Sequence, residues 1–111
     1  MFDRSKMTRC PSHPGAVIKG LYLEPAQISI STLAEHIGVS RKTLSRIING
    51  HAGVTPEMSL RLSKALNTSP DLWMNMQRGY DLWMAENSNT DWQSITPLPG
   101  LHQQTQDTAQ Q

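Results

Sequence analysis

Residues 30–49 carry the feature that most restricts the fold: two short amphipathic helical patterns, separated by a three-residue break that contains a glycine. Ser29 can cap the first helix and Ser40 the second, because a serine hydroxyl accepts a hydrogen bond from a backbone N–H of the first helical turn. Gly38 lies where the first helix ends, at a position that favours a left-handed backbone. A short helix, a tight break and a second helix are the ingredients of a helix-turn-helix motif.

The residue types inside this segment fit the motif. Ala34 is small where the second helix must approach the first closely. The positions that would hold the two helices together are all apolar: Leu33, Ile37, Val39, Leu44 and Ile47. We therefore expect the two helices to pack as one unit and to expose the remaining positions of the second helix.

The second helix has a polar face that suits contact with DNA. Four of its side chains are spaced i, i+3, i+4 and i+7 and form one stripe: Lys42, Ser45, Arg46 and Asn49. Arginine and lysine can donate to guanine, asparagine can pair with adenine, and serine can contact a base or a phosphate. Arg41 flanks the stripe, and Ser40 with the first backbone N–H groups of the helix could hold a phosphate. An ordinary solvated helix face is the alternative interpretation.

Charge is divided unevenly along the chain, although the net charge is only +1. Residues 1–64 hold nine Lys and Arg and four acids, a balance of +5, whereas residues 65–111 have a balance of −4. No acid lies between residues 37 and 56, and three basic residues do. The local positive charge over the motif favours a phosphate-rich partner.

The remaining patterns predict three more helices, which makes this an all-α, five-helix chain. One of the three helices precedes the two helices of the motif and is the first helix of the chain. Pro14 suits its first position, and Pro25 is expected to end it. The sequence Thr55-Pro56-Glu57 opens a fourth helix, and Ser69-Pro70-Asp71 opens a fifth that continues to about Asn87.

With 111 residues the chain is long enough for one core, and we place it in residues 13–88. Residues 1–12 form a flexible leader, and the Gln- and Thr-rich residues 89–111 form a disordered tail because they have little to bury. No apolar run approaches the roughly 18 residues of a membrane span, and the start is polar, so a cytoplasmic protein is expected. The single cysteine, Cys10, cannot form an internal disulfide.

Enzyme functions have little support in the sequence. The four histidines show no metal-ligand spacing with one another or with Cys10: His13, His36, His51 and His102. Structural or solvated histidines are the more common case. Paired carboxylates and glycine-rich phosphate loops are also absent from the sequence. We therefore expect no catalysis, no metal and no cofactor.

Several runs of sequence resemble the HigA-type antitoxins, which belong to the lambda-repressor-like (XRE) helix-turn-helix proteins. The resemblance covers about residues 13–86, and the runs of the last two helices are more specific to the family than the motif itself. The runs are LAEHIGVSR at 33–41, IING at 47–50, VTPEM at 54–58, LRLSK at 60–64, TSPDLWMNMQ at 68–77 and YDLW at 80–83.

The resemblance implies a lambda-repressor-like dimer that binds operator DNA, represses its own operon and neutralises a HigB-type toxin that cleaves messenger RNA on ribosomes. It assigns DNA contacts to the matching residues of the recognition helix: Ser40, Arg41, Lys42, Thr43, Ser45, Arg46 and Asn49. Family members often carry a basic residue just after the Asn-Gly turn, where this chain has His51-Ala52-Gly53. We therefore expect one interaction with the DNA backbone to be missing and the operator affinity to be weaker.

The fifth helix is the expected dimer interface, because two recognition helices must enter successive major grooves about 34 Å apart. Its large side chains alternate in spacings of three and four: Trp73, Met76, Tyr80 and Trp83. The alternative is that the tryptophans complete the core of one chain. We further expect the acidic second part of the chain to attract a basic toxin.

Two other functions stay open at this point. The chain could be a stand-alone repressor, of the prophage type, without a toxin partner. It could also be a protein-interaction module that has lost DNA binding. A neighbouring reading frame for a small basic toxin would favour the antitoxin, and binding to the DNA upstream of the chain's own gene would exclude the interaction module.

Overall fold

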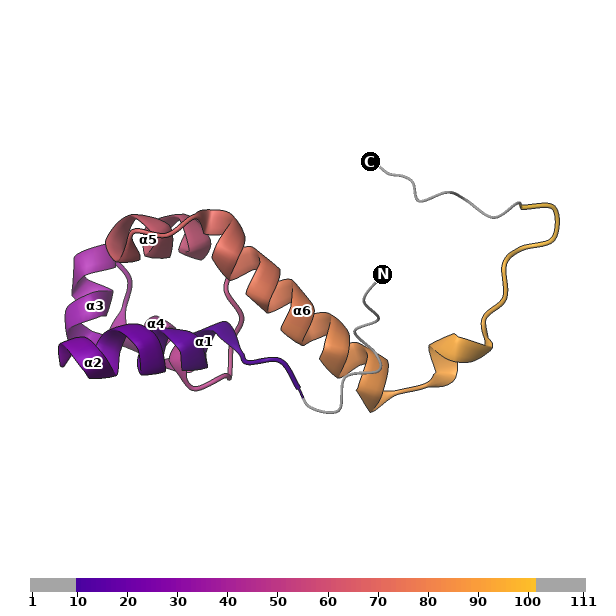
Figure 1. Ribbon diagram of the computed structural model, residues 1–111, viewed down its shortest axis with the longest axis horizontal. Helices are drawn as coiled ribbons and strands as arrows, with labels where there is room; N and C mark the ends of the chain where they lie inside the picture. Colours follow the sequence, from indigo (N-terminus) through magenta and orange to yellow (C-terminus); the bar gives the residue numbers. More distant parts are fainter. Residues whose placement is uncertain (1–9, 102–111) are drawn as a thin grey trace.

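Every regular element that the computed structural model describes, within residues 10–101, is a helix (Figure 1). The all-α prediction is confirmed. Most of the expected leader and the last ten residues lie outside the described range, so their predicted flexibility stays a prediction. The elements are α1 Pro14–Val17, η2 Ile18–Leu23, α2 Glu24–Ala26, α3 Ile30–Ile37, α4 Arg41–Ile48, α5 Pro56–Leu66, α6 Pro70–Ser88 and η3 Asp91–Ser94.

The first three elements form one continuous helix, so the prediction that Pro25 ends the first helix is wrong. The helix ends instead at Gln27, which has a left-handed backbone with φ of 57°. Its middle part, η2, is a π-helix, and the N–H of Glu24 donates to the carbonyl of Lys19 five residues back. Proline donates no backbone hydrogen bond and its ring crowds the preceding turn, so a wider turn before Pro25 lets the helix continue through it.

The predicted starts of the other helices are confirmed, and so are the predicted ends of α3 at Gly38 and of α6 near Asn87. Gly38 and Gly50 have φ of 79° and 78° and follow α3 and α4, where the left-handed backbone favours glycine. Each predicted cap accepts a hydrogen bond from the backbone N–H three residues ahead, at 3.0 to 3.2 Å: Ser29, Ser40, Thr55 and Ser69. Local sequence signals therefore define the helix-turn-helix segment and the two helices that follow it.

Trp73 of α6 lies in the core of the single chain and has no exposed surface. Its Nε1 donates to Oγ1 of Thr68 at 2.7 Å, and its ring centroid lies 6.0 Å from that of Tyr22. The expectation that Trp73 belongs to a dimer interface is therefore not supported by its position. The other buried apolar residues come from the first helix, α3, α4, α5 and the loop before α5: Ile18, Leu23, Leu33, Ala34, Ile37, Leu44, Ile47, Ile48, Val54, Met58 and Leu62.

The backbone of α1 lies directly against the backbone of α4 at Gly15. A Cβ atom added to Gly15 would overlap the carbonyl oxygen of Ile47 and would lie 2.7 Å from the Cα of Ile48. No side chain lies between the two helices at this point. The first helix thus supports the second helix of the motif through a contact that only glycine permits.

The C-terminal half of α6 extends away from the other helices, and the 3-10 helix η3 follows it (Figure 1). The backbone N–H of Asp91 donates to Oδ1 of Asn89 at 2.8 Å, which fixes the turn into η3. The sequence did not predict this element. All residues from 89 to 101 are exposed, so this segment adds nothing to the core.

His13 caps the first helix with a ring nitrogen rather than an oxygen. Its Nδ1 accepts from the N–H of Gly15 at 2.9 Å, and its ring packs edge-on against Tyr80 with centroids 4.9 Å apart. Burial lowers the pKa of His13 from its ordinary value of 6.5, whereas the charge of Asp81 and a backbone hydrogen bond with Ala52 oppose this shift. The neutral ring is the form that the folded chain favours.

We expect the chain to lose stability as the pH falls below 6.5, the ordinary pKa of His13. Below this value the unfolded chain binds the proton more readily than the folded chain, so the stabilisation is complete above it and is lost on acidification through the lower folded-state pKa. A protonated ring also cannot accept from Gly15. Urea unfolding from about pH 7.5 to about pH 5 measures the slope.

The control is His13→Asn, which keeps a capping oxygen but does not titrate. Its free energy of unfolding should vary less with pH than that of the parent chain across this range. Parallel pH profiles for the two proteins would show that His13 does not contribute to the slope.

Candidate nucleic-acid interface

The turn between α3 and α4 is closed by backbone hydrogen bonds to one carbonyl. Gly38 and Val39 both donate to the carbonyl of Ala34, at 2.9 and 3.0 Å. Ala34 itself is only 1% exposed, and α3 and α4 pack against each other. The structure therefore confirms the predicted packing of the two helices.

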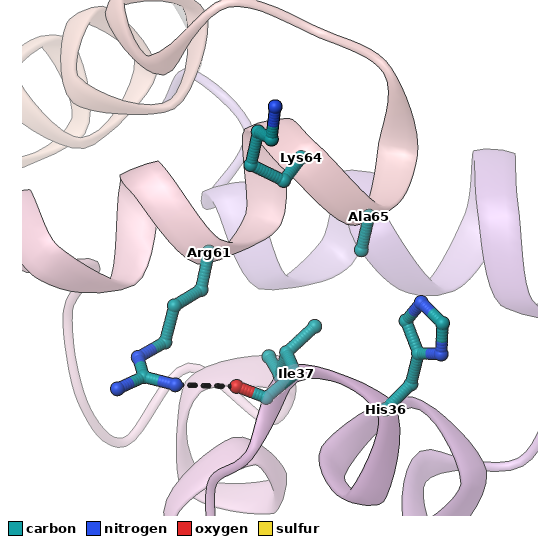
Figure 2. A pocket seen from close by; sticks show the side chains of 5 residues that line it. All are labelled: His36, Ile37, Arg61, Lys64 and Ala65. Carbon is teal, nitrogen blue, oxygen red and sulfur yellow. Dashed lines mark hydrogen bonds between the residues drawn. The ribbon is translucent and has the colours of Figure 1, made fainter.

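Arg61 of α5 holds this turn from outside, an interaction that sequence analysis did not find. Its Nη1 donates to the carbonyl of Ile37 at the end of α3, at 2.6 Å (Figure 2), and its Nη2 pairs with Glu57 at 3.2 Å. An open pocket of about 290 Å³ lies beside it, between α3 and α5, and His36 and Lys64 also line it. The sequence offered no signal, because a half-exposed arginine on a helix usually points into solvent.

The polar residues of α4 lie on its exposed face, as predicted. Of the seven candidate DNA contacts only Ser45 is half-buried, and the other six are exposed: Ser40, Arg41, Lys42, Thr43, Arg46 and Asn49. The Oγ of Ser40 donates to Oγ1 of Thr43 at 2.8 Å, and Nδ2 of Asn49 donates to Oγ of Ser45 at 3.2 Å. The structure thus brings these residues to one accessible surface, and their contact with DNA stays a prediction.

The side chain of Arg46, on this face, is hydrogen-bonded to the loop that follows α4. Its Nη2 donates to the backbone carbonyl of His51 at 3.1 Å, in the loop between α4 and α5. The same loop turns back on α4, since the N–H of His51 donates to the carbonyl of Arg46 at 2.8 Å. A groove of about 240 Å³ separates α4 from this loop, and Thr43, Arg46 and Gly53 are among the residues that line it.

The four residues expected at a dimer interface do not form one free surface. Trp73 is buried, Met76 packs partly against the core, and Tyr80 packs on His13 of the same chain. Trp83 is half-buried near the end of α6, and Met84 beside it is 42% exposed. If α6 pairs with a second copy, its C-terminal half is the part that remains available.

Within residues 10–101, no group of three or more His, Cys, Asp or Glu is arranged to hold a metal ion. Cys10 is free and exposed. The same range contains no helix that is both long and apolar enough for a membrane crossing. None of these three observations adds a second candidate site to the polar face of α4.

Comparisons with known proteins agree with this geometry. Residues 21–73, which include α3 to α5, match the helix-turn-helix family HTH_3. An uncharacterised HTH-type transcriptional regulator of Haemophilus influenzae is 38% identical over 97 residues, which are 86% of this chain and 91% of that protein. The antitoxin HigA-1 of Vibrio cholerae is 39% identical over 82 residues, 74% of this chain and 77% of that protein.

A solved structure of the Pseudomonas aeruginosa antitoxin HigA with the higBA promoter has the same fold. It superposes with a TM-score of 0.74 at 32% identity, covering 82% of this chain and 99% of that one. The similarity extends through the motif and well beyond it, so it concerns the domain as a whole. This chain belongs to the helix-turn-helix (XRE) family of DNA-binding regulators, to which the HigA antitoxins are also related.

Proposed function

We propose that this chain is the antitoxin of a HigB/HigA-type module, which binds operator DNA as a dimer, represses its own operon and neutralises a toxin that cleaves messenger RNA. The observation that carries the DNA part is the exposed polar face of α4, which packs against α3 and against the glycine contact with α1, while Arg61 of α5 bonds to the end of α3. The similarity to HigA-1 of Vibrio cholerae supports the antitoxin part. The site would act in the cytoplasm, where operator DNA is found.

The proposed contacts with DNA are of two chemical kinds, to base edges and to phosphates. Arg46 and Asn49 lie centrally on the exposed face of α4 and would donate to base edges in the major groove. Arg41, Lys42 and the N-terminal turn of α4 behind Ser40 would hold the phosphate backbone. Phosphate contacts give affinity for any sequence, whereas base contacts distinguish the operator from other DNA.

The decisive experiment measures binding to the DNA upstream of the chain's own gene and to a scrambled duplex. Changing Arg41, Lys42 and Arg46 together to glutamine should abolish the preference and reduce the dependence of affinity on salt, by a slope of about 0.9 for each phosphate that the variant no longer neutralises. Lys19→Gln, an exposed lysine of the first helix, is the matched control. Unchanged operator affinity in the triple variant would favour a protein-interaction module.

The proposed dimer uses the end of α6. Trp83→Ala should produce a folded chain that sediments as a monomer and binds the operator weakly, because single recognition helices cover only a few base pairs. Circular dichroism shows whether the variant is folded, and analytical ultracentrifugation gives its mass. An unchanged dimer would place the interface elsewhere on the chain.

The proposed toxin would be basic, since it acts on RNA, and the acidic second part of this chain would speed its capture. Co-expression with the adjacent reading frame tests whether such a partner exists. Association should slow at high salt and in Asp71→Asn/Asp91→Asn, two exposed positions. No effect of salt or of these changes would contradict electrostatic capture. The absence of any toxin in the neighbouring frame would favour a stand-alone repressor.

A further inference from the structure

Gln77 of α6 is a buried polar residue that joins two distant parts of the chain. It is 6% exposed, and its Oε1 accepts from the backbone N–H of Val54 at 2.8 Å. Its Nε2 donates to Oδ1 of Asp81, one turn further along α6, at 2.9 Å. The other buried polar side chains in residues 10–101, Ser59 and Ser63, bond only to carbonyls of their own helix.

The loop between α4 and α5 fits closely against this amide. A Cβ atom on Gly53 would lie 3.1 Å from Cδ and 3.2 Å from Nε2 of Gln77, so the loop backbone comes almost into contact with the side chain. Val54 is 4% exposed, and its N–H therefore has no solvent to bond with if Gln77 is removed. A buried donor without a partner is unfavourable, so the loop would have to move.

The two groups bonded to the Gln77 side-chain amide fix its orientation. Val54 offers a donor and Asp81 offers a carboxylate, so only one orientation of Gln77 satisfies both. Rotating the amide by half a turn would place a donor against a donor and an acceptor against an acceptor. An apolar side chain of the same length could fill the space but could not hold the loop.

The other end of the same loop is fastened to Arg46. The carbonyl of His51 accepts from Nη2 of Arg46 at 3.1 Å, and the N–H groups of His51 and Ala52 both donate to the carbonyl of Arg46, at 2.8 and 3.2 Å. Three residues after His51 the loop meets Gln77 at Val54. Hydrogen bonds at both ends therefore connect α6 to a side chain on the exposed face of α4.

From these hydrogen bonds we infer that Gln77 is a positioning residue for operator binding: by holding the loop at Val54 it keeps the His51 carbonyl where it orients the guanidinium of Arg46. The inference rests on the proposed DNA contact of Arg46. A preoriented arginine loses less conformational freedom when it binds a base, so the benefit appears as affinity for the correct sequence. Random DNA, which is bound through phosphates, should gain little from it.

Gln77→Met tests the inference, because methionine has a similar length but makes neither hydrogen bond. We expect operator affinity to fall about five- to tenfold, within the range of coupling between residues of one hydrogen-bond network, and affinity for random DNA to stay nearly unchanged. In an Arg46→Ala background Gln77→Met should cause little further loss. A purely structural role would instead weaken operator binding by the same factor in both backgrounds.

A polarity swap provides the rescue. In Gln77→Glu/Asp81→Asn the new carboxylate can accept from the N–H of Val54 and from the new amide, so both hydrogen bonds are kept and only the one between positions 77 and 81 has its donor and acceptor exchanged. Operator affinity should return close to that of the parent chain, while Gln77→Glu alone, with two carboxylates facing each other, should not recover it.

The experiments distinguish failure of the proposed Arg46 base contact from failure of the positioning role of Gln77. If Arg46→Ala alone leaves operator binding unchanged, the proposed base contact fails and this inference fails with it. If Arg46→Ala weakens binding but the loss from Gln77→Met is additive, or if the swapped pair is no better than Gln77→Met, only this inference is overturned. Circular dichroism at the assay temperature confirms that each variant is folded.

Discussion

Gly15→Ala is expected to lower the free energy of unfolding by about 3 kcal/mol, at the upper end of what overpacking usually costs. The added methyl group would overlap the carbonyl oxygen of Ile47 and come within 2.7 Å of the Cα of Ile48. Both atoms belong to the backbone of α4, so no side-chain rotation can make room. The first helix must therefore move away from α4. Urea unfolding followed by circular dichroism measures the loss.

Gly20→Ala is the matched control, in the same continuous helix. A Cβ atom on Gly20 would meet nothing within 4 Å, so alanine should stabilise the chain by about 0.5–1 kcal/mol through the lower entropy of its unfolded state. Opposite signs for the two glycines are the expected result. A neutral effect of Gly15→Ala would mean that the backbones of α1 and α4 do not touch.

The parts of the fold that sequence analysis predicted correctly are those with local signals. Caps such as Ser40 and Thr55 act on N–H groups three residues away, and glycines such as Gly38 act on their own backbone angle. The polar face of α4 also follows from spacing alone. Such features do not depend on how distant segments meet.

The parts that sequence analysis missed depend on how distant segments meet. Gly15 directly follows Pro14 at the start of the first helix, and its role is set by Ile47, far along the chain. Gln77 and Arg61 looked like ordinary polar residues of exposed helix faces. Their hydrogen bonds span 23 and 24 residues, which no periodicity reveals.

Pro25 and Trp73 differ from expectation for other reasons: Pro25 was given the most common role of proline, and for Trp73 the alternative, the core of one chain, describes its position better than the dimer interface. Proline usually ends a helix, but a π-helical turn before Pro25 lets this one continue. Trp73 has the spacing expected of a helix–helix dimer interface, yet its side chain is completely buried in the core of the single chain. In a domain this small, one large side chain supplies much of the core.

Arg46→Ala tests the central claim, that the exposed face of α4 reads operator DNA. The change should cost about 1–3 kcal/mol in binding to the correct operator, a loss of roughly five- to 150-fold, because a bidentate interaction with a base edge disappears. Random DNA of the same length should lose much less, since it is bound through phosphates.

Arg78→Ala, which removes an exposed arginine of α6, controls for the change in net charge. Fluorescence anisotropy at one fixed salt concentration, with labelled operator and random duplexes in parallel, gives the ratio of the two affinities for each protein. We predict that this ratio falls toward one in Arg46→Ala and is unchanged in Arg78→Ala. Equal losses of Arg46→Ala on operator and random DNA would contradict the claim.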